Sequence, residues 1–317
     1  MTAPHRLSLE RIARAVTVID PVYLDSPQFL AEGPGGDAGC RLVVKVETLN
    51  PIRSFKARGT EFLTASLEGK PHLACATAGN FGQGMAWSAR KRGFPLTIFT
   101  AMTANPLKVK RMRELGAEVR QVGGDFDEAH EAAKEFAAAN GARMIEDGRD
   151  VEIAEGAGTI GVELLRWPEP FDSIVVPLGD GALLAGIAHW MKAHRPATRM
   201  IGVCATGAPA MDQSWRSGKV REAPAETIAD GIAVTSPFAE ALSDITGVVD
   251  DILLVDDDAI VSAIRRAHGD LGVVLEPAGA AALAAVLARP GRFRGQLVGV
   301  ILSGGNATTD QLRRWLA

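Results

Sequence analysis

The stretch NPIRSFKARG, residues 50–59, follows a strand-like run, RLVVKVET at residues 41–48, and leads into a segment with the apolar spacing of a helix. An Asn-Pro pair breaks the strand, and Ser54 is a natural N-cap for a helix over residues 55–68. Lys56 therefore stands in the first helical turn, where the positive end of the helix dipole disfavours a cation. If the site is also desolvated, the pKa of this lysine falls, which suits an amine that must react in its neutral form. Taken alone, a lysine here would be read as a solvated surface residue.

Along the chain, short β-branched runs alternate with longer segments of helical period. This alternation predicts parallel strands joined by crossover helices, and so a doubly wound α/β fold with both sheet faces covered. The expected strands are residues 41–48, 72–77, 95–100, 117–122, 172–178, 199–205, 251–255 and 297–303. The expected helices are residues 55–68, 82–92, 105–115, 126–140, 157–166, 182–194, 258–270 and 277–288.

Two polar stretches that contain glycine, residues 68–71 and 146–150, are candidate crossings between domains. If both are crossings, residues 72–147 form a smaller domain that is inserted into a larger one. The larger domain is then made of residues 1–71 and 148–317.

The composition, with 47% apolar and 23% charged residues, is that of an ordinary globular protein. A net charge of -4, without a basic run, gives no reason to expect a nucleic-acid partner. The N-terminus lacks the apolar core of a signal peptide, and the longest apolar run, residues 278–288, is too short to span a bilayer. The odd number of cysteines (Cys40, Cys75 and Cys204) is typical of reduced thiols, so we expect a cytoplasmic protein without a membrane partner.

Three expected strands end in loops with ligand-binding chemistry: TAGNFG at residues 77–82, PLGDGAL at residues 177–183 and SGGN at residues 303–306. In open parallel sheets, ligands bind outside the carboxyl ends of the strands. The second loop leads into a helix, whose free amides suit a phosphate group. It matches the dinucleotide fingerprint poorly, because Leu184 stands where the third glycine is needed, so a nicotinamide cofactor is not expected.

Six motifs occur in order over nearly the whole chain: SFKARG, TAGNFGQG, VVPLGDGALLAG, TIADGIAV, LEPAGAAA and ILSGGN. Together they resemble the fold type II pyridoxal-phosphate (PLP) enzymes, and most of all the threonine and serine dehydratases and their relative serine racemase. The resemblance implies two doubly wound open-sheet domains of the tryptophan synthase β-like type, the smaller inserted in the larger. It also implies pyridoxal 5'-phosphate as cofactor, a small amino acid as substrate and a homodimer.

By this resemblance, Lys56 is the Schiff-base lysine and also the general base. Phe55 is expected on one face of the cofactor ring and Gly231 near the other. Asn80 is expected to bond the ring hydroxyl and Ser303 to meet the pyridine nitrogen. A serine there makes the ring a weaker electron sink than a carboxylate would, which favours elimination of a β-substituent. The phosphate is expected on the backbone of Gly179, Asp180, Gly181, Ala182 and Leu183.

The substrate carboxylate is expected on the loop made of Thr77, Ala78, Gly79, Asn80 and Phe81. Within it, Ala78 stands where serine racemases carry a second catalytic serine, so dehydration is favoured over racemisation. Phe81 replaces the histidine that is usual after the loop asparagine, and it suits a substrate with a less polar side chain. Arg53 replaces a common glycine, and it is either a surface residue or an extra contact to an anionic group.

Other departures from the family pattern affect the expected ligands. Asp180 would repel a phosphate unless its side chain points away, so only the loop backbone carries that role. Cys204 replaces a glutamate metal ligand of racemase-like relatives, and no metal site is expected there. Glu276 either lies near the cofactor or belongs to a Glu-Pro pair that simply favours the start of a helix.

The predicted activity is an ammonia-lyase reaction that removes water from a β-hydroxy amino acid and gives a 2-oxo acid and ammonia. Two alternatives stay open: β- or γ-replacement, as in cysteine synthase or threonine synthase, and a non-catalytic PLP-binding protein. The sequence does not distinguish serine, threonine, 3-hydroxyaspartate and an aryl-serine as substrates. The contacts that discriminate them are expected within residues 146–155 and 208–217.

Overall fold

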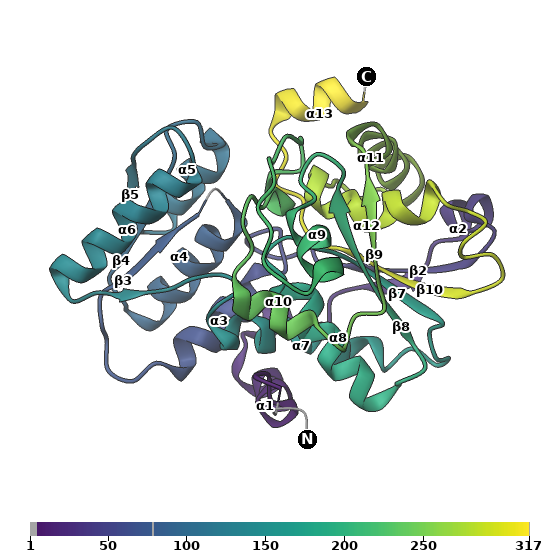
Figure 1. The fold of residues 1–317 in the computed structure, drawn as a ribbon, viewed down its shortest axis with the longest axis horizontal. Helices are drawn as coiled ribbons and strands as arrows, with labels where there is room; N and C mark the ends of the chain where they lie inside the picture. The colour runs from purple at the N-terminus through teal and green to yellow at the C-terminus, as the bar shows by residue number, and fades with distance from the viewer. Residues whose placement is uncertain (1–4, 78, 317) are drawn as a thin grey trace.

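The computed structural model describes residues 5–77 and 79–316, in which the strands form two sheets (Figure 1). A six-stranded sheet has the order β1-β2-β10-β7-β8-β9, and a four-stranded sheet has the order β5-β4-β3-β6. The strands of the larger sheet are β1 (Gln28–Leu30), β2 (Arg41–Val46), β7 (Ser173–Pro177), β8 (Arg199–Ala205), β9 (Asp251–Val255) and β10 (Leu297–Leu302). Those of the smaller sheet are β3 (Leu73–Ala76), β4 (Leu96–Thr100), β5 (Glu118–Gln121) and β6 (Arg143–Met144).

The α-helices that connect and cover these strands are distributed over the whole chain. They are α1 (Leu9–Val18), α2 (Glu32–Ala38), α3 (Lys56–Ser66), α4 (Asn80–Arg92), α5 (Pro106–Glu114), α6 (Phe126–Asn140), α7 (Val151–Leu164), α8 (Ala182–His194), α9 (Ala210–Ser217), α10 (Ala239–Ile245), α11 (Asp257–Leu271), α12 (Pro277–Leu287) and α13 (Thr309–Leu316). Two 3₁₀ turns, η1 (Pro21–Tyr23) and η2 (Asp230–Ile232), complete the described elements.

All strand pairs are parallel except β1 with β2, which places the antiparallel strand at the edge of the larger sheet. The central strands are buried on both faces, as in other parallel sheets covered by helices. Successive side chains of β7 enter different apolar clusters: Ile174 joins the cluster that contains residues of α7 and α8, and Val175 joins the cluster of α12. The expected doubly wound α/β arrangement is confirmed.

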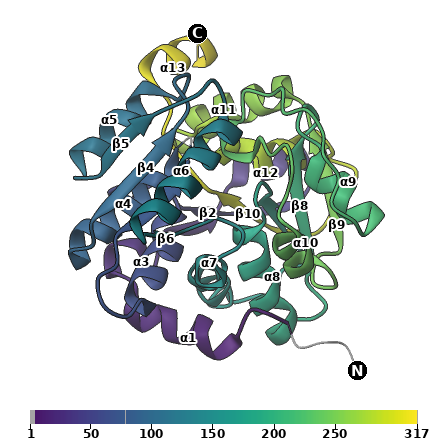
Figure 2. The same ribbon diagram turned by 60° about the vertical axis from the view of Figure 1, so that its left-hand side comes forward.

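On one side of the larger sheet, α7 packs against both α3 and α8, and Figure 2 shows α7 and α8 next to each other. The contact between α3 and α7 brings the two backbones together, because a Cβ added to Gly156 would lie 2.4 Å from the carbonyl oxygen of Arg58. Only glycine permits this approach. The first turn of α3 therefore packs closely against α7.

Every strand and helix predicted from the sequence is present, although the helix expected at residues 157–166 begins earlier, at Val151. The predicted cap of α3 is wrong. Phe55, in a helical conformation, is the N-cap, and Ser54 instead forms a β-bridge with Gly304. Ser54 Oγ still accepts a long hydrogen bond of 3.4 Å from the Lys56 amide. Pairing with a distant segment, rather than a local cap, sets where α3 begins.

All strands of the smaller sheet fall between Leu73 and Met144, and all strands of the larger sheet lie outside this range. This distribution motivates the proposal that residues 72–147 form a domain inserted between residues 1–71 and 148–317. Figure 1 shows the smaller sheet with α5 and α6 on the left and the larger sheet on the right. Within residues 5–77 and 79–316, the helices are all too short or too polar to cross a membrane.

Candidate active site

A cavity of about 310 Å³ lies at the carboxyl ends of β3, β7 and β10, where the three predicted ligand loops meet. This size suits a small-molecule site. The cavity brings together nearly all of the residues singled out in the sequence: Phe55, Lys56, Thr77, Gly79, Asn80, Phe81, Gly179, Asp180, Gly181, Ala182, Leu183, Gly231 and Ser303.

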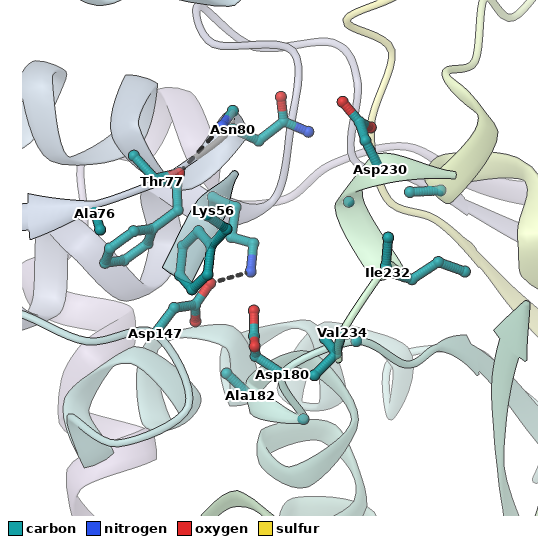
Figure 3. A pocket seen from close by; sticks show the side chains of 18 of the residues that line it. Lys56, Ala76, Thr77, Asn80, Asp147, Asp180, Ala182, Asp230, Ile232 and Val234 are labelled. Carbon is teal, nitrogen blue, oxygen red and sulfur yellow. Dashed lines mark hydrogen bonds and ion pairs between the residues drawn. The ribbon is translucent and has the colours of Figure 1, made fainter. Parts of the chain in front are cut away.

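The Lys56 amine points into the cavity from the first residue of α3 (Figure 3). It lies 4.9 Å from the centroid of the Phe55 ring and donates a hydrogen bond to Asp147 Oδ2. The side chain of Lys56 is 14% exposed and that of Asp147 is 10% exposed, so both groups are largely withdrawn from solvent. The other oxygen, Asp147 Oδ1, is buried and has no hydrogen-bond partner in the described part of the chain.

A buried ionic cluster fixes α3 two residues beyond Lys56. Arg58 is fully buried, and its guanidinium donates to the carboxylates of both Glu47 and Glu163. Lys45 donates to the same Glu163 carboxylate from β2. Because each buried charge has an opposite partner, the cluster satisfies the condition under which buried ions are tolerated. It ties the start of α3 to β2 and α7.

The loop between β7 and α8 has the geometry expected of a phosphate cradle. Gly181 adopts a positive φ of 93°, and no side chain caps α8, so the amides of its first turn are free to bind an anion. A Cβ on Gly179 would lie 3.0 Å from Ile232 Cα, so a larger residue would crowd this side of the cavity. With the amine of Lys56 and the Ser303 hydroxyl, which line the same cavity, this donor set fits pyridoxal phosphate.

The Asp180 side chain does not point away from the cavity. Figure 3 shows it directed toward Lys56, from the side opposite to Asn80. Burial and the nearby Asp147 carboxylate raise the pKa of Asp180 to about 7, against the opposing effect of the Lys56 ammonium. In its protonated form, this side chain does not repel a phosphate group. Protonation, rather than orientation, is therefore what would relieve the conflict expected from the sequence.

A polar network closes the cavity on the side of Asn80. Asn80 donates to Glu276 Oε1 and accepts a 2.9 Å hydrogen bond from Asn306. Lys108, from α5, forms ion pairs of 3.2 Å with Glu276 and 2.8 Å with Asp230. Burial lowers the pKa of Lys108, but attraction by Glu276 and Asp230 outweighs it and raises the pKa overall.

The Glu276 side chain, for which the sequence allowed two interpretations, belongs to this network. Glu276 is the N-cap of α12, but its side chain makes no capping hydrogen bond. It accepts a hydrogen bond from Asn80 and forms an ion pair with Lys108 instead. Sequence reasoning missed Lys108 and also missed Asp147 as a partner of Lys56. Neither lies in a recognisable motif, although Asp147 lies in the region where substrate contacts were expected.

The loop that follows β3 is held by its own side chains. The amide of Gly79 donates a 3.1 Å hydrogen bond to Thr77 Oγ1, and Thr77 and Phe81 are both buried at the cavity wall. Ala78, the expected replacement for a racemase serine, lies outside the described residues. The carboxylate-binding role of this loop stays a prediction.

Arg53 departs from the rest of the expected site. It is exposed, adopts a positive φ of 52° and is not among the residues that line the cavity. Its carbonyl oxygen accepts a 2.9 Å hydrogen bond from the Gly305 amide, which helps to fix the Ser54 turn. The position therefore supports the surface interpretation of Arg53 and not a contact to substrate.

The expected position of a racemase metal ligand, Cys204, is buried in β8. In the described ranges, no group of three His, Cys, Asp or Glu residues is arranged to hold a metal ion. The absence of a metal site stays a prediction.

Comparison with known proteins agrees with this geometry. Residues 19–304 match the family described as "Pyridoxal-phosphate dependent enzyme". The L-threonine ammonia-lyase of Thermotoga maritima is 35% identical over 94% of this chain and 74% of that protein. The L-threonine ammonia-lyase of Geobacter sulfurreducens is 37% identical over 84% of this chain and 68% of that protein. The structure of maize serine racemase superposes with a TM-score of 0.91 at 28% identity and covers 97% of this chain and 96% of the racemase chain. The chain therefore belongs to the pyridoxal-phosphate-dependent enzymes.

Proposed function

We propose that this PLP-dependent enzyme is an ammonia-lyase that removes water from a β-hydroxy amino acid of the serine or threonine type. The products are a 2-oxo acid and ammonia. The observation that carries the proposal is the Lys56 amine, which projects from the start of α3 into the cavity where the three loops meet. The similarity to two L-threonine ammonia-lyases over most of the chain supports the same class of reaction.

The residues that would hold the cofactor come from helices and loops that follow strands of both sheets. Lys56 would bind it covalently, and the backbone of residues 179–183 would bind its phosphate. Asn80 would bond the ring hydroxyl, and Ser303 would meet the ring nitrogen. Phe55 and Gly231, which both line the cavity, would lie on opposite faces of the ring, as the resemblance implies. When bound, pyridoxal phosphate withdraws electrons from the substrate Cα and so makes its proton acidic.

The chain's own groups then bind the substrate and move its protons. The amides of the loop at residues 77–81 would bind the substrate carboxylate, which fixes the orientation of Cα. The neutral amine of Lys56 would take the Cα proton, and Asp147 would hold the resulting ammonium by the hydrogen bond that it already accepts. The Ser303 hydroxyl, unlike a carboxylate, would not hold a proton on the ring nitrogen, and this favours prompt loss of the β-substituent.

We also propose that the protein acts as a homodimer in the cytoplasm. Resemblance to the fold type II enzymes supports the dimer, and three free cysteines, Cys40, Cys75 and Cys204, support a reducing compartment. Light scattering coupled to size-exclusion chromatography tests the dimer directly. A mass of one chain, 33.4 kDa, would contradict it.

The function is tested with a panel of β-hydroxy amino acids: L-serine, L-threonine, 3-hydroxyaspartate and phenylserine. Purified protein with added pyridoxal phosphate should release a 2-oxo acid and ammonia in equal amounts from at least one of them. The same reactions with added sulfide should not divert the product into a new amino acid. Formation of a new amino acid without a 2-oxo acid would favour replacement chemistry instead.

A further inference from the structure

Two carboxylates converge on the Lys56 amine from different elements. Asp147 follows β6 and accepts a hydrogen bond from Lys56, and Asp180 projects from the loop before α8 (Figure 3). The two acidic segments are packed against each other at Gly148. A Cβ at Gly148 would lie 2.8 Å from the Asp180 carbonyl oxygen and 3.3 Å from Asp180 Cβ, and Gly148 has a positive φ of 87°.

The charges that face Asp180 are Lys56 and Asp147. Two other side chains of the cavity, Lys108 and His130, are engaged elsewhere, whereas Asp125 and Asp127 are exposed to solvent. Lys108 pairs with Asp230 and Glu276, and His130 pairs with Glu146. One oxygen of Asp147 is bonded to Lys56, while the other is buried and lacks a partner in the described residues. An unpartnered carboxylate oxygen of this kind is costly unless a proton or a ligand group meets it during function.

Burial and the Asp147 charge raise the pKa of Asp180 to about 7. A phosphate bound on the adjacent backbone would add negative charge and raise the pKa further. The Asp180 carboxyl therefore exchanges between its acid and carboxylate forms near neutral pH. A protonated acid in the loop that holds the cofactor phosphate can donate a proton inside the cavity.

We propose that Asp180 is the catalytic acid that protonates the leaving hydroxyl, and that Asp147 is the relay between Lys56 and Asp180. This inference rests on the proposed dehydratase function and adds the source of the leaving-group proton. It gives Asp180 a chemical role at a position where a carboxylate would otherwise only weaken phosphate binding.

The proton balance closes within these three residues. The Lys56 amine takes the proton from Cα, and the electron pair of that C–H bond forms the Cα–Cβ double bond. The Cβ–O bond breaks with its electron pair on oxygen, and the Asp180 carboxyl gives its proton to that oxygen, so water leaves. The ammonium of Lys56 then passes its proton through Asp147 to Asp180. The cycle ends with a neutral amine and a protonated Asp180, without an external acid.

The first test uses the cofactor-free protein, so that it does not depend on turnover. Carbon-13 NMR of protein labelled at the aspartate carboxyls should show one resonance that titrates near pH 7. That resonance should be missing in Asp180→Asn, and it should titrate at lower pH in Asp147→Asn, which removes the neighbouring charge. Asp127→Asn is the matched control, because Asp127 lines the same cavity but is exposed. An Asp180 resonance that titrates near pH 4 would overturn the proposal.

The second test compares leaving groups. L-Serine loses hydroxide, which needs a proton, whereas β-chloro-L-alanine loses chloride, which needs none. Asp180→Asn should lower kcat on L-serine by about 10²- to 10⁴-fold, the usual loss for a general acid. On β-chloro-L-alanine the loss should be under about tenfold. The affinity for pyridoxal phosphate, followed by quenching of protein fluorescence, should not fall, because the neutral asparagine places no negative charge beside the phosphate.

Equal losses on both substrates, or no loss on either, would overturn the role of Asp180. Failure of the proposed function looks different: wild-type protein would then process β-chloro-L-alanine but none of the β-hydroxy amino acids. In that case the NMR titration still decides whether Asp180 holds a proton. Should Asp180→Asn fail to fold, the Asp180 resonance is identified instead by its shift in Asp147→Asn, and its titration near pH 4 in the wild type would overturn the proposal.

Discussion

The amine of Lys56 and the carboxylate of Asp147, separated by 91 positions in the chain, are hydrogen-bonded inside the cavity. This contact joins the first turn of α3 to the segment that follows β6, the last strand of the smaller sheet along the chain. It places an acceptor on the amine that must gain and lose a proton. The pH dependence of the reaction should therefore depend on a residue that no motif identifies.

Replacement of Asp147 by asparagine should shift the alkaline limb of the pH–rate profile to lower pH. Asp180 acts in its protonated form, so activity falls as the pH rises through the pKa of Asp180. Asp147 raises that pKa, and its removal lowers it. We also expect kcat to fall by about 10²-fold, since an amide does not relay a proton. The measurement is kcat against pH, with Asp127→Asn as the control. An unchanged profile would show that Asp147 does not act on Asp180.

The stability of the cofactor-free protein should respond to Asp180→Asn in a pH-dependent way. The pKa of Asp180 is raised to about 7 in the native state, against about 3.9 in the unfolded chain. Between these values the native state binds more protons, so this group lowers the free energy of unfolding as the pH rises. Asp180→Asn has no carboxyl that titrates at this position. Its free energy of unfolding should therefore rise, relative to that of the wild type, by on the order of 2–4 kcal/mol between pH 4 and pH 8. Urea unfolding at both pH values measures it, and a constant difference would contradict it.

Lys108→Met should destabilise the protein by about 3–5 kcal/mol, because the buried Glu276 carboxylate loses its ionic partner. The control is Lys110→Met on the same helix, where the side chain is 73% exposed and the change should stay within about 0.5 kcal/mol. Urea unfolding of the two variants in parallel measures the difference. Similar small effects for both would mean that Lys108 is not held in the network.

Arg58→Met should cost about 3–5 kcal/mol, because it leaves Glu47 and Glu163 as buried carboxylates with one fewer cation. Arg58→Lys should recover only part of this loss, since a single ammonium cannot make the guanidinium's bonds to both carboxylates. Arg41→Met, which removes a surface pair with Glu169, should cost under about 1 kcal/mol. Thermal unfolding of the three variants orders them, and an Arg58→Met value near that of Arg41→Met would contradict the cluster's role.

The sequence predicts much of the fold because the strands are nearly continuous apolar runs, such as LVGVIL in β10, bounded by glycine and polar turns. The elements it missed are short or carry conflicting signals. Helix α2 has the sequence EGPGGDA, which is poor in helix formers, and it forms where Pro34, Gly35 and Ala38 are buried. Strand β6 is two residues long and exists through its pairing with β3.

The residues of the candidate site likewise fall into those that the sequence predicts and those that it does not. Residues that follow the parallel strands β3, β7 and β10 were predictable, because parallel strands bring their carboxyl ends to one edge of the sheet. Lys108 and Lys110 look alike in the sequence of α5, yet their side chains are 2% and 73% exposed. They differ in their partners, because Lys108 pairs with Asp230 and Glu276 from distant segments, and Lys110 pairs with Glu114 on the same helix. Asp147 likewise depends on how the chain turns after β6.

The most direct test of the central claim, that Lys56 is the reacting amine of a dehydratase, is release of 2-oxo acid from L-serine and L-threonine by wild type and Lys56→Ala. Both proteins are assayed with excess pyridoxal phosphate, and circular dichroism checks that both are folded. We expect release by the wild type and a loss of at least about 10³-fold in the variant, which has no amine to take the Cα proton. Release at the same rate by the folded Lys56→Ala variant would contradict the claim.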